Sequence, residues 1–211
     1  MKQEISNAVI RRLPKYLRYL TGLENRGVER ISSQQLGELT GFTASQIRQD
    51  FNHFGGFGQQ GYGYNVKFLK EEIARIIGLN QPKRIAIVGL GHLGTALANN
   101  GILNEESFRL TALFDKNPEV IGTEMAGIRI SDVSEMSKVI RERKIDILTV
   151  TTPRSVAQAV VDEAVQAGVR GIWNFALLDL VLPKGVALEN VHLRESLFTL
   201  DYYMSNGGKE E

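Results

Sequence analysis

The sequence predicts an α/β protein in which a helical N-terminal domain precedes a doubly wound parallel sheet and a final helix. From residue 83 onward, short apolar runs alternate with helical patterns, as in parallel sheets covered by helices. A Gly-x-Gly-x-x-Gly pattern follows the first of those runs. The preceding residues instead show helical periodicity and then a glycine-rich stretch. We therefore predict three parts, at residues 1–80, 81–192 and 193–211.

Charge is divided unevenly between these parts. Residues 1–80 contain 11 lysines and arginines and 7 acidic residues, a net charge of +4, whereas residues 81–211 contain 14 and 17, a net charge of −3. Only the first part suits a polyanion, although charge alone leaves an ordinary solvated surface equally open. The absence of cysteine excludes disulfides and thiolate metal sites. No apolar run approaches the ~20 residues of a membrane helix, so we expect a cytoplasmic protein without a membrane partner.

Three helices are predicted before the glycine-rich stretch at residues 55–64. Apolar residues repeat at helical spacing over residues 7–24, and Pro14 either kinks this helix or begins its second half. A short helix is predicted between an N-cap at Ser32 and an end at Gly41. The residues Thr43-Ala44-Ser45-Gln46 form a capping box that starts the third helix.

The second and third helices have helix-turn-helix spacing, and the third is the candidate recognition helix. Ile47 and Phe51 should pack inward, which leaves hydroxyl, amide and guanidinium groups on the outer face, where they can read base edges. The predicted DNA-contacting residues here are Thr43, Ser45, Gln46, Arg48, Gln49 and Asn52. A small helical bundle that binds no nucleic acid is the alternative, because the pattern is a weak signal in one sequence.

Residues 55–64 alternate glycines with aromatic and amide residues, which excludes a helix and favours a tight hairpin. The tip of such a hairpin can lie on phosphates or enter a minor groove. Its predicted DNA-contacting residues are Gln59, Gln60, Gly61 and Tyr62. A further helix at 66–77 ends at Gly78, and residues 79–82 are the predicted linker.

The second part alternates predicted strands and helices, with strands at 85–88, 110–114, 145–150, 171–173 and 187–191 and helices at 133–143 and 155–167. A doubly wound sheet binds ligands beyond the carboxyl ends of its strands. The candidate cofactor-binding residues therefore follow the strands: Gly89, Gly91, His92, Leu93, Gly94, Asp115, Lys116, Thr151, Thr152, Pro153, Asn174, Phe175 and Ala176. Plain turn chemistry explains Thr151, Thr152 and Pro153 equally well.

The glycine pattern at 89–94 is a dinucleotide-binding fingerprint, which is weak evidence by itself. Asp115 adds weight because it ends the second strand, 21 positions after Gly94, where a carboxylate accepts hydrogen bonds from the adenosine ribose. A carboxylate also repels a 2′-phosphate, so we predict NAD rather than NADP, although Lys116 opposes that argument. A helix N-cap or a turn residue is the alternative role for Asp115.

The final stretch repeats Leu193, Leu197, Leu200 and Met204 at helical spacing, and such an apolar face must be buried. It packs either on its own domain or on a partner subunit. DNA readers of this kind usually pair two recognition helices on a palindrome, which favours a homodimer. His192 has no visible orienting carboxylate, so we predict no catalytic role for it.

Taken together, several segments resemble the bacterial redox-sensing transcriptional repressors called Rex, over nearly the whole chain. They are residues 12–16, 43–50, 54–55, 61–64, 89–94 and 174–176. The resemblance implies winged-helix and Rossmann domains and a C-terminal helix swapped between the subunits of a homodimer. It also implies that palindromic operator DNA is released when NADH binds, with NAD⁺ as the weaker competitor, so that genes for fermentation or anaerobic respiration are repressed when NADH is scarce.

Three positions depart from the family pattern. Relatives often carry a proline at Leu177, an acidic residue at His192 and a basic residue at Gln49. An NAD-dependent dehydrogenase with an N-terminal cap is the main alternative function, but the sequence shows no proton-transfer pair and little chain for a substrate domain. A CoA-binding module is a third possible function, but it does not explain the glycine-rich hairpin at residues 55–64. We therefore predict a regulator without catalytic or metal-binding residues.

Overall fold

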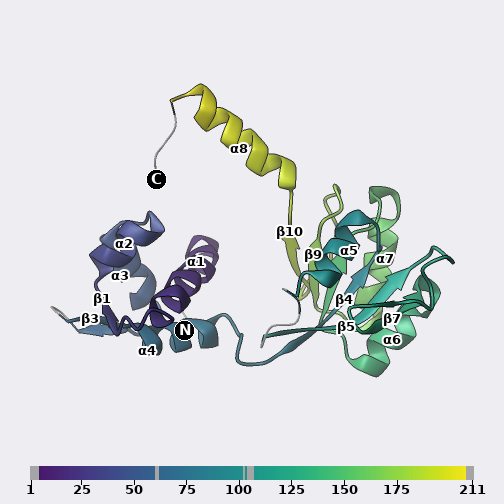
Figure 1. Ribbon diagram of the computed structural model, residues 1–211, viewed down its shortest axis with the longest axis horizontal. Coiled ribbons are helices and arrows are strands. Elements are labelled where there is room, and N and C mark those ends of the chain that lie inside the picture. The colour runs from purple at the N-terminus through teal and green to yellow at the C-terminus, as the bar shows by residue number, and fades with distance from the viewer. Residues whose placement is uncertain (1–4, 60–61, 102, 104–106, 208–211) are drawn as a thin grey trace. The chain divides into compact units, whose positions relative to one another are not determined.

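The computed structural model describes residues 5–59, 62–101, 103 and 107–207. The chain divides into two compact units, and the boundary along the sequence lies between Gln81 and Pro82 (Figure 1). The helices of the first unit are α1 (Asn7–Glu24), α2 (Ser33–Thr40), α3 (Ala44–Asn52) and α4 (Val66–Ile76). Its strands, β1 (Arg30–Ile31), β2 (Gly58–Gln59) and β3 (Gly63–Asn65), form an antiparallel sheet in the order β1-β3-β2.

Local chemistry sets the helix ends of this unit. Ser32 and Thr43 form the capping boxes that begin α2 and α3, and Gly41 ends α2 in the left-handed conformation. Helix α1 continues through Pro14, while Leu13 and Leu20 on its inner face are fully buried. The helices pack around one apolar core, which positions α3 with its polar face outward.

The second unit contains a seven-stranded sheet in the order β10-β9-β8-β4-β5-β7-β6. All neighbouring strands are parallel except the pair β6 and β7. The strands are β4 (Lys83–Val88), β5 (Phe108–Asp115), β6 (Glu124–Met125), β7 (Ile128–Asp132), β8 (Ile147–Val150), β9 (Gly171–Asn174) and β10 (Ala187–Asn190). The chain direction across the sheet reverses between β4 and β8, and such a switch point is where doubly wound sheets bind ligands.

Helices cover the two faces of this sheet. They are α5 (His92–Asn99), α6 (Met136–Arg143), which follows the short helix η1 (Val133–Glu135), and α7 (Arg154–Ala167). Apolar residues of α6 and α7 pack on one face, and those of α5 pack on the other. The last helix, α8 (Leu193–Ser205), has no buried residue. Among the described residues, no helix has the length and hydropathy required to cross a membrane.

The strands β1, β6 and β7 were not among the predicted elements. Strands β1 and β6 contain two residues each, so they carry no periodicity. The turn between β6 and β7 places both Ala126 and Gly127 at positive φ, and Ala126 gives no turn signal because alanine rarely adopts that conformation. The predicted helix at 133–143 is interrupted, since η1 precedes α6.

Candidate functional site

The connection between β4 and α5 is tight because neither Gly89, in the loop, nor Gly94, in the first turn of α5, has room for a side chain. Gly89 has φ +90°, and a Cβ atom added there would lie 2.9 Å from the carbonyl oxygen of Thr151. A Cβ atom at Gly94 would lie 2.0 Å from the carbonyl oxygen of Gly89. Helix α5 therefore starts directly against the end of β4, with its first backbone N–H groups at the carboxyl edge of the sheet.

Two side chains hold this loop in place. The carboxylate of Asp115, at the end of β5, accepts hydrogen bonds from the backbone N–H groups of Leu90 and, at 2.8 Å, Asn117. The hydroxyl of Thr151, after β8, lies 2.7 Å from the carbonyl oxygen of Gly89. The residues that follow β5 and β8 thus meet at the glycine loop, at the carboxyl ends of the parallel strands where the sequence analysis placed the candidate residues.

A cavity of about 560 Å³ opens at this edge of the sheet. It is lined by the predicted residues Gly89, Gly91, Asp115, Lys116, Thr151, Thr152 and Pro153. The buried hydroxyl of Thr152 has no hydrogen-bond partner among the described residues. An unpaired polar atom at the wall of a cavity is costly unless a ligand or water pairs with it, so Thr152 indicates a polar ligand group here.

Val133, Val156 and Val160 also line this cavity, and no sequence motif pointed to them. Val133 directly follows β7, and the other two lie on α7. They give this cavity an apolar part of its lining, which suits a flat heterocycle such as adenine. Val133 becomes a candidate only once β7 is placed beside β5, a non-local pairing.

The remaining predicted cofactor residues do not line the cavity. His92 and Leu93 are exposed at the start of α5, and Gly94 is buried. Asn174 is 1% exposed, and its amide group donates to the Leu178 carbonyl oxygen at 3.0 Å and to Asn190 Oδ1 at 2.8 Å. Asn174 Oδ1 accepts a hydrogen bond from the backbone N–H of Ala176 at 3.0 Å. In this structure Asn174 therefore shapes the loop after β9, which carries Phe175 and Ala176.

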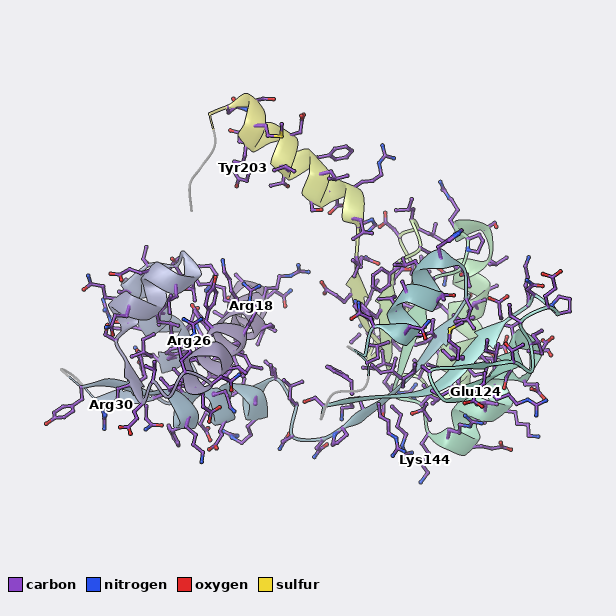
Figure 2. The ribbon with its side chains drawn as sticks, in the orientation of Figure 1. Arg18, Arg26, Arg30, Glu124, Lys144 and Tyr203 are labelled. Atoms are coloured by element: carbon purple, nitrogen blue, oxygen red, sulfur yellow. The ribbon has the colours of Figure 1, made fainter. Side chains whose placement is uncertain are left out.

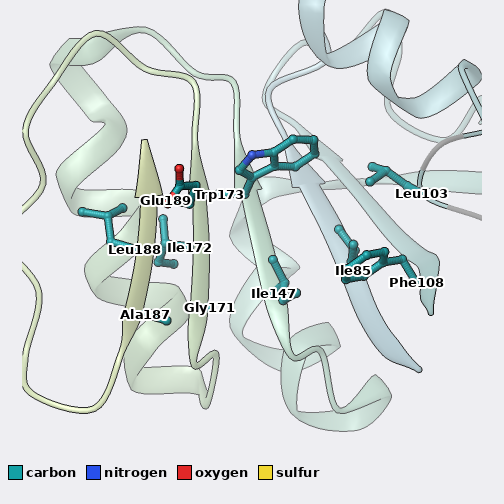
Figure 3. A pocket seen from close by; sticks show the side chains of 10 residues that line it. All are labelled: Ile85, Leu103, Phe108, Ile147, Gly171, Ile172, Trp173, Ala187, Leu188 and Glu189. Carbon is teal, nitrogen blue, oxygen red and sulfur yellow. The ribbon is translucent and has the colours of Figure 1, made fainter. Parts of the chain in front are cut away.

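Another cavity of about 560 Å³ lies on a different part of the same unit (Figure 3). Its lining includes Ile85, Ile147 and Trp173, and it contains none of the predicted cofactor residues. This cavity is apolar apart from Glu189, and no glycine loop or helix N-terminus contributes to it. Volume alone does not distinguish the two cavities, whereas the polar groups at the switch point favour the cavity beside the glycine loop as the candidate nucleotide site.

The outer face of α3 carries the predicted DNA-contacting residues. Thr43, Ser45, Gln46, Arg48, Gln49 and Asn52 are all exposed, while Ile47 and Phe51 are buried. The side-chain oxygen of Gln46 accepts from the Thr43 backbone N–H at 3.0 Å, which leaves its amide N–H groups free of the capping box. Arg48 Nη1 donates to the hydroxyl of Ser33 at 3.0 Å and so joins α3 to the start of α2.

The hairpin of β2 and β3 follows α3. Gln60 and Gly61 lie outside the described residues, as does the side chain of Gln59. Tyr62 is 68% exposed, and the guanidinium carbon of Arg30 lies 5.5 Å from the centre of its ring. Arg30, labelled in Figure 2, also lies 3.4 Å from the Tyr62 carbonyl oxygen through Nη1. A cation and an aromatic ring are thus presented together beside the tip of the hairpin.

Two protein-family models match separate parts of this chain. Residues 4–52 match the family described as "Putative DNA-binding protein N-terminus", and residues 80–178 match the family described as "CoA binding domain". The redox-sensing transcriptional repressor Rex of Clostridioides difficile is 52% identical over 205 residues, 97% of this chain and 98% of that relative. Rex of Clostridium beijerinckii is 53% identical over 203 residues, 96% of each chain.

Solved structures show the same relationship. RSP, a Rex-family repressor, in complex with β-NAD⁺ and operator DNA has a TM-score of 0.92 and 46% identity, covering 97% of this chain and 94% of that one. The complex of RSP with β-NADH has a TM-score of 0.90 and 43% identity, covering 97% and 96%. This chain therefore belongs to the Rex family of redox-sensing transcriptional repressors.

Proposed function

We propose that this protein represses transcription by binding operator DNA through its first unit and that it leaves the DNA when NADH binds the second. One observation carries the proposal: an exposed recognition helix and a glycine loop held by Asp115 occur in the same chain. A dehydrogenase would need the loop but has no use for the helix. The first unit acts as a winged helix, in which the β2–β3 hairpin is the wing.

The residues at the switch point fit a dinucleotide. The N-terminal N–H groups of α5 would bind the pyrophosphate. Thr152, which lines the cavity and has a buried hydroxyl without a partner among the described residues, would contribute that hydroxyl. Asp115 would accept hydrogen bonds from the adenosine ribose. Val133, Val156 and Val160 would contact the adenine. The bound dinucleotide acts here as an effector that reports its own redox state, and no bond in it is made or broken.

The loop after β9 gives a physical basis for preferring the reduced cofactor. Phe175 is half-buried there, with its ring centre 4.6 Å from that of Trp173, and Ala176 is buried. The nicotinamide ring of NAD⁺ is cationic and that of NADH is neutral, so an apolar pocket penalises the oxidised form. A preference of about 100-fold requires only about 2.7 kcal/mol of differential binding free energy.

Thermodynamic linkage connects the two sites. If NADH favours a conformation in which the paired recognition helices no longer match successive major grooves, NADH and DNA each weaken the binding of the other by the same factor. The loss of DNA affinity then cannot exceed the ratio of the NADH affinities of the two conformations.

Fluorescence anisotropy tests this proposal. The probe is a labelled palindromic duplex that the protein enriches from a random-sequence library, titrated at several concentrations of NADH, NAD⁺ or CoA. We expect NADH to raise the Kd for the duplex, NAD⁺ to act only at higher concentration, and CoA to have no effect. A Kd that is the same with and without NADH contradicts the proposal, and release by CoA instead of NADH favours a CoA sensor.

We also propose that the protein is a homodimer in which α8 packs against the other subunit. The apolar side chains of α8 are all largely exposed within a single chain, with Leu193 and Leu197 each at 61% and Met204 at 74%. A helix with such a face is stable in water only when something covers it. Sedimentation equilibrium tests the assembly, and a monomer at micromolar concentration contradicts it.

A further inference from the structure

Arg12, Tyr16 and Asp50 form a hydrogen-bonded cluster that joins α1 to the recognition helix α3, in which Tyr16 and Asp50 are buried and Arg12 is partly exposed. Arg12 Nε and Nη2 donate to the two carboxylate oxygens of Asp50, each at 2.7 Å, and the Tyr16 hydroxyl donates to Oδ2 at 2.7 Å. Asp50 is 2% exposed, and Tyr16 is fully buried. Two N–H groups of Arg12 and the hydroxyl of Tyr16, all on α1, therefore bind the Asp50 carboxylate on α3. We call these three residues the clamp.

The clamp also contacts the turn between α2 and α3. The ring of Tyr16 meets Phe42, in that turn, edge-on at 5.5 Å, and it meets Phe51 of α3 edge-on at 5.1 Å. The guanidinium carbon of Arg12 lies 5.8 Å from the centre of the Phe42 ring. Helix α1 thus contacts both the turn and the second helix of the helix-turn-helix.

A gain in folding stability does not explain why a buried carboxylate and its partners join these two helices. Removing a carboxylate from water is costly, and apolar residues of similar volume often hold two helices together equally well. A bidentate arginine–carboxylate pair supplies something that apolar contacts lack, because it fixes both the distance and the relative orientation of its two groups. Asp50 directly follows Gln49 on α3, so its position determines where the exposed side chains of that helix point.

We propose that Arg12, Tyr16 and Asp50 are positioning residues that set the rotation of α3 and hence the selectivity for operator over other duplex DNA. This inference rests on the proposed DNA-binding function. Non-specific affinity arises from phosphates that lysine and arginine neutralise, and it tolerates a small rotation of one helix. Recognition of base edges does not tolerate such a rotation, because the hydrogen bonds to base edges are directional.

The experiment compares two substitutions with a matched control in the full-length protein. Arg12→Lys keeps the charge and loses the bidentate geometry, whereas Asp50→Asn keeps the shape and loses the charge. Arg75→Lys is the control, because Arg75 forms a 2.6 Å salt bridge with Glu72 on α4 in the same unit, with its side chain 59% exposed. The readout is the ratio of Kd values for a scrambled duplex and for the duplex that wild-type protein enriches from a random library.

We expect the ratio to fall roughly tenfold for Arg12→Lys and Asp50→Asn, about what one mismatched base pair costs, with the Kd for scrambled DNA unchanged. Arg75→Lys should keep the wild-type ratio. Tyr16→Phe removes one hydrogen bond from the clamp and keeps the ring, so it should lower the ratio less. If Arg12→Lys or Asp50→Asn fails to fold, the ratio of Kd values measured for Tyr16→Phe tests the inference instead.

Four outcomes overturn the inference. An unchanged ratio shows that the clamp does not affect selectivity, and equal weakening on both duplexes shows only a loss of folded protein. Tighter binding of Asp50→Asn to both duplexes shows that Asp50 acts through charge repulsion rather than position. If wild-type protein prefers no duplex, the proposed function fails and the inference fails with it, whereas a selective wild type with unaltered variants refutes the clamp alone.

Discussion

The carboxylate of Asp115 at the end of β5 accepts a hydrogen bond from the backbone N–H of Leu90, the residue between the first two glycines of the loop after β4. The same carboxylate accepts from Asn117 and lines the cavity at the switch point. Asp115 therefore has two separable roles, since it holds the glycine loop and it presents negative charge to a ligand.

Substitution of Asp115 should separate these roles. Asp115→Asn keeps an acceptor for Leu90 but removes the charge, so we expect weaker NADH binding and reduced discrimination against NADPH. Asp115→Ala should weaken NADH binding further, by about 10- to 100-fold, because hydrogen bonds to a charged group contribute about 1.5–3 kcal/mol. Calorimetric titration with NADH and NADPH measures both effects. Asp162→Asn on α7 is the control, and an Asp115→Ala protein with wild-type NADH affinity would show that the ribose lies elsewhere.

Two glycines of the loop should respond differently to alanine. Gly91 has φ −68°, and a Cβ atom added there would meet only open space, so Gly91→Ala should leave the unfolding free energy unchanged. It should nevertheless weaken NADH binding roughly tenfold or more, because the second glycine lets the pyrophosphate approach the backbone. The variant should still bind operator DNA and should respond poorly to NADH. Normal release by NADH would mean that the dinucleotide does not approach this loop.

Gly94→Ala should instead damage the fold. Its Cβ atom would lie 2.0 Å from the Gly89 carbonyl oxygen and 2.9 Å from Thr151 Oγ1, and the first of these contacts is with backbone, so the glycine loop itself would have to shift. We expect a loss of about 3 kcal/mol in the stability of the second unit. Urea denaturation followed by the fluorescence of Trp173, in that unit, measures it. Equal stability of Gly91→Ala and Gly94→Ala would contradict the tight turn.

Local chemistry made much of the fold predictable. The capping boxes at Ser32 and Thr43 and the left-handed Gly41 lie within a few residues of the helix ends that they define. Asp115 could be found because strand order places it beside the glycine loop. Each of these signals is short in sequence or follows from a general rule of doubly wound sheets.

Non-local contacts account for what the sequence did not reveal. Arg12 and Asp50 are 38 positions apart, and no periodicity connects them. Strand β7 has five residues and pairs with β5 at positions such as Leu113 and Ile130, so its recognition requires the folded sheet. The role of Val133 at the cavity wall depends on that pairing. The partnerless hydroxyl of Thr152 is likewise visible only once its neighbours among the described residues are placed.

A charge on the apolar face of α8 should disrupt the proposed dimer. Leu197→Asp places a carboxylate where the helix would be buried, and we expect dimerisation to weaken about 100-fold. Loss of the partner uncovers α8, so helix content measured by circular dichroism should fall by no more than this one helix contributes, because Leu197 makes no buried contact within one chain. Sedimentation equilibrium gives the dissociation constant, with Lys138→Asp on α6 as the control. Equal dimerisation of both variants would place the interface away from α8.

Alkaline pH should destabilise the first unit through Tyr16. Burial and the hydrogen bond to Asp50 raise the pKa of Tyr16, so the folded protein retains this proton at a pH where the unfolded chain has lost it. The contribution to stability is complete below the ordinary tyrosine pKa of about 10 and is lost as the pH rises toward the folded value. The unfolding free energy should then fall by at most about 1.4 kcal/mol per pH unit for this group.

Tyr16→Phe isolates this effect, because phenylalanine keeps the ring and has no proton to lose. Burial also raises the pKa of Tyr64, so the variant should still lose some stability at high pH, but with a shallower slope than wild type. Urea denaturation followed by circular dichroism at pH 8, 9, 10 and 11, roughly spanning the ordinary pKa, measures both slopes. Parallel slopes would show that the Tyr16 hydroxyl ionises as readily in the folded protein as in the unfolded chain, and that the clamp does not hold its proton.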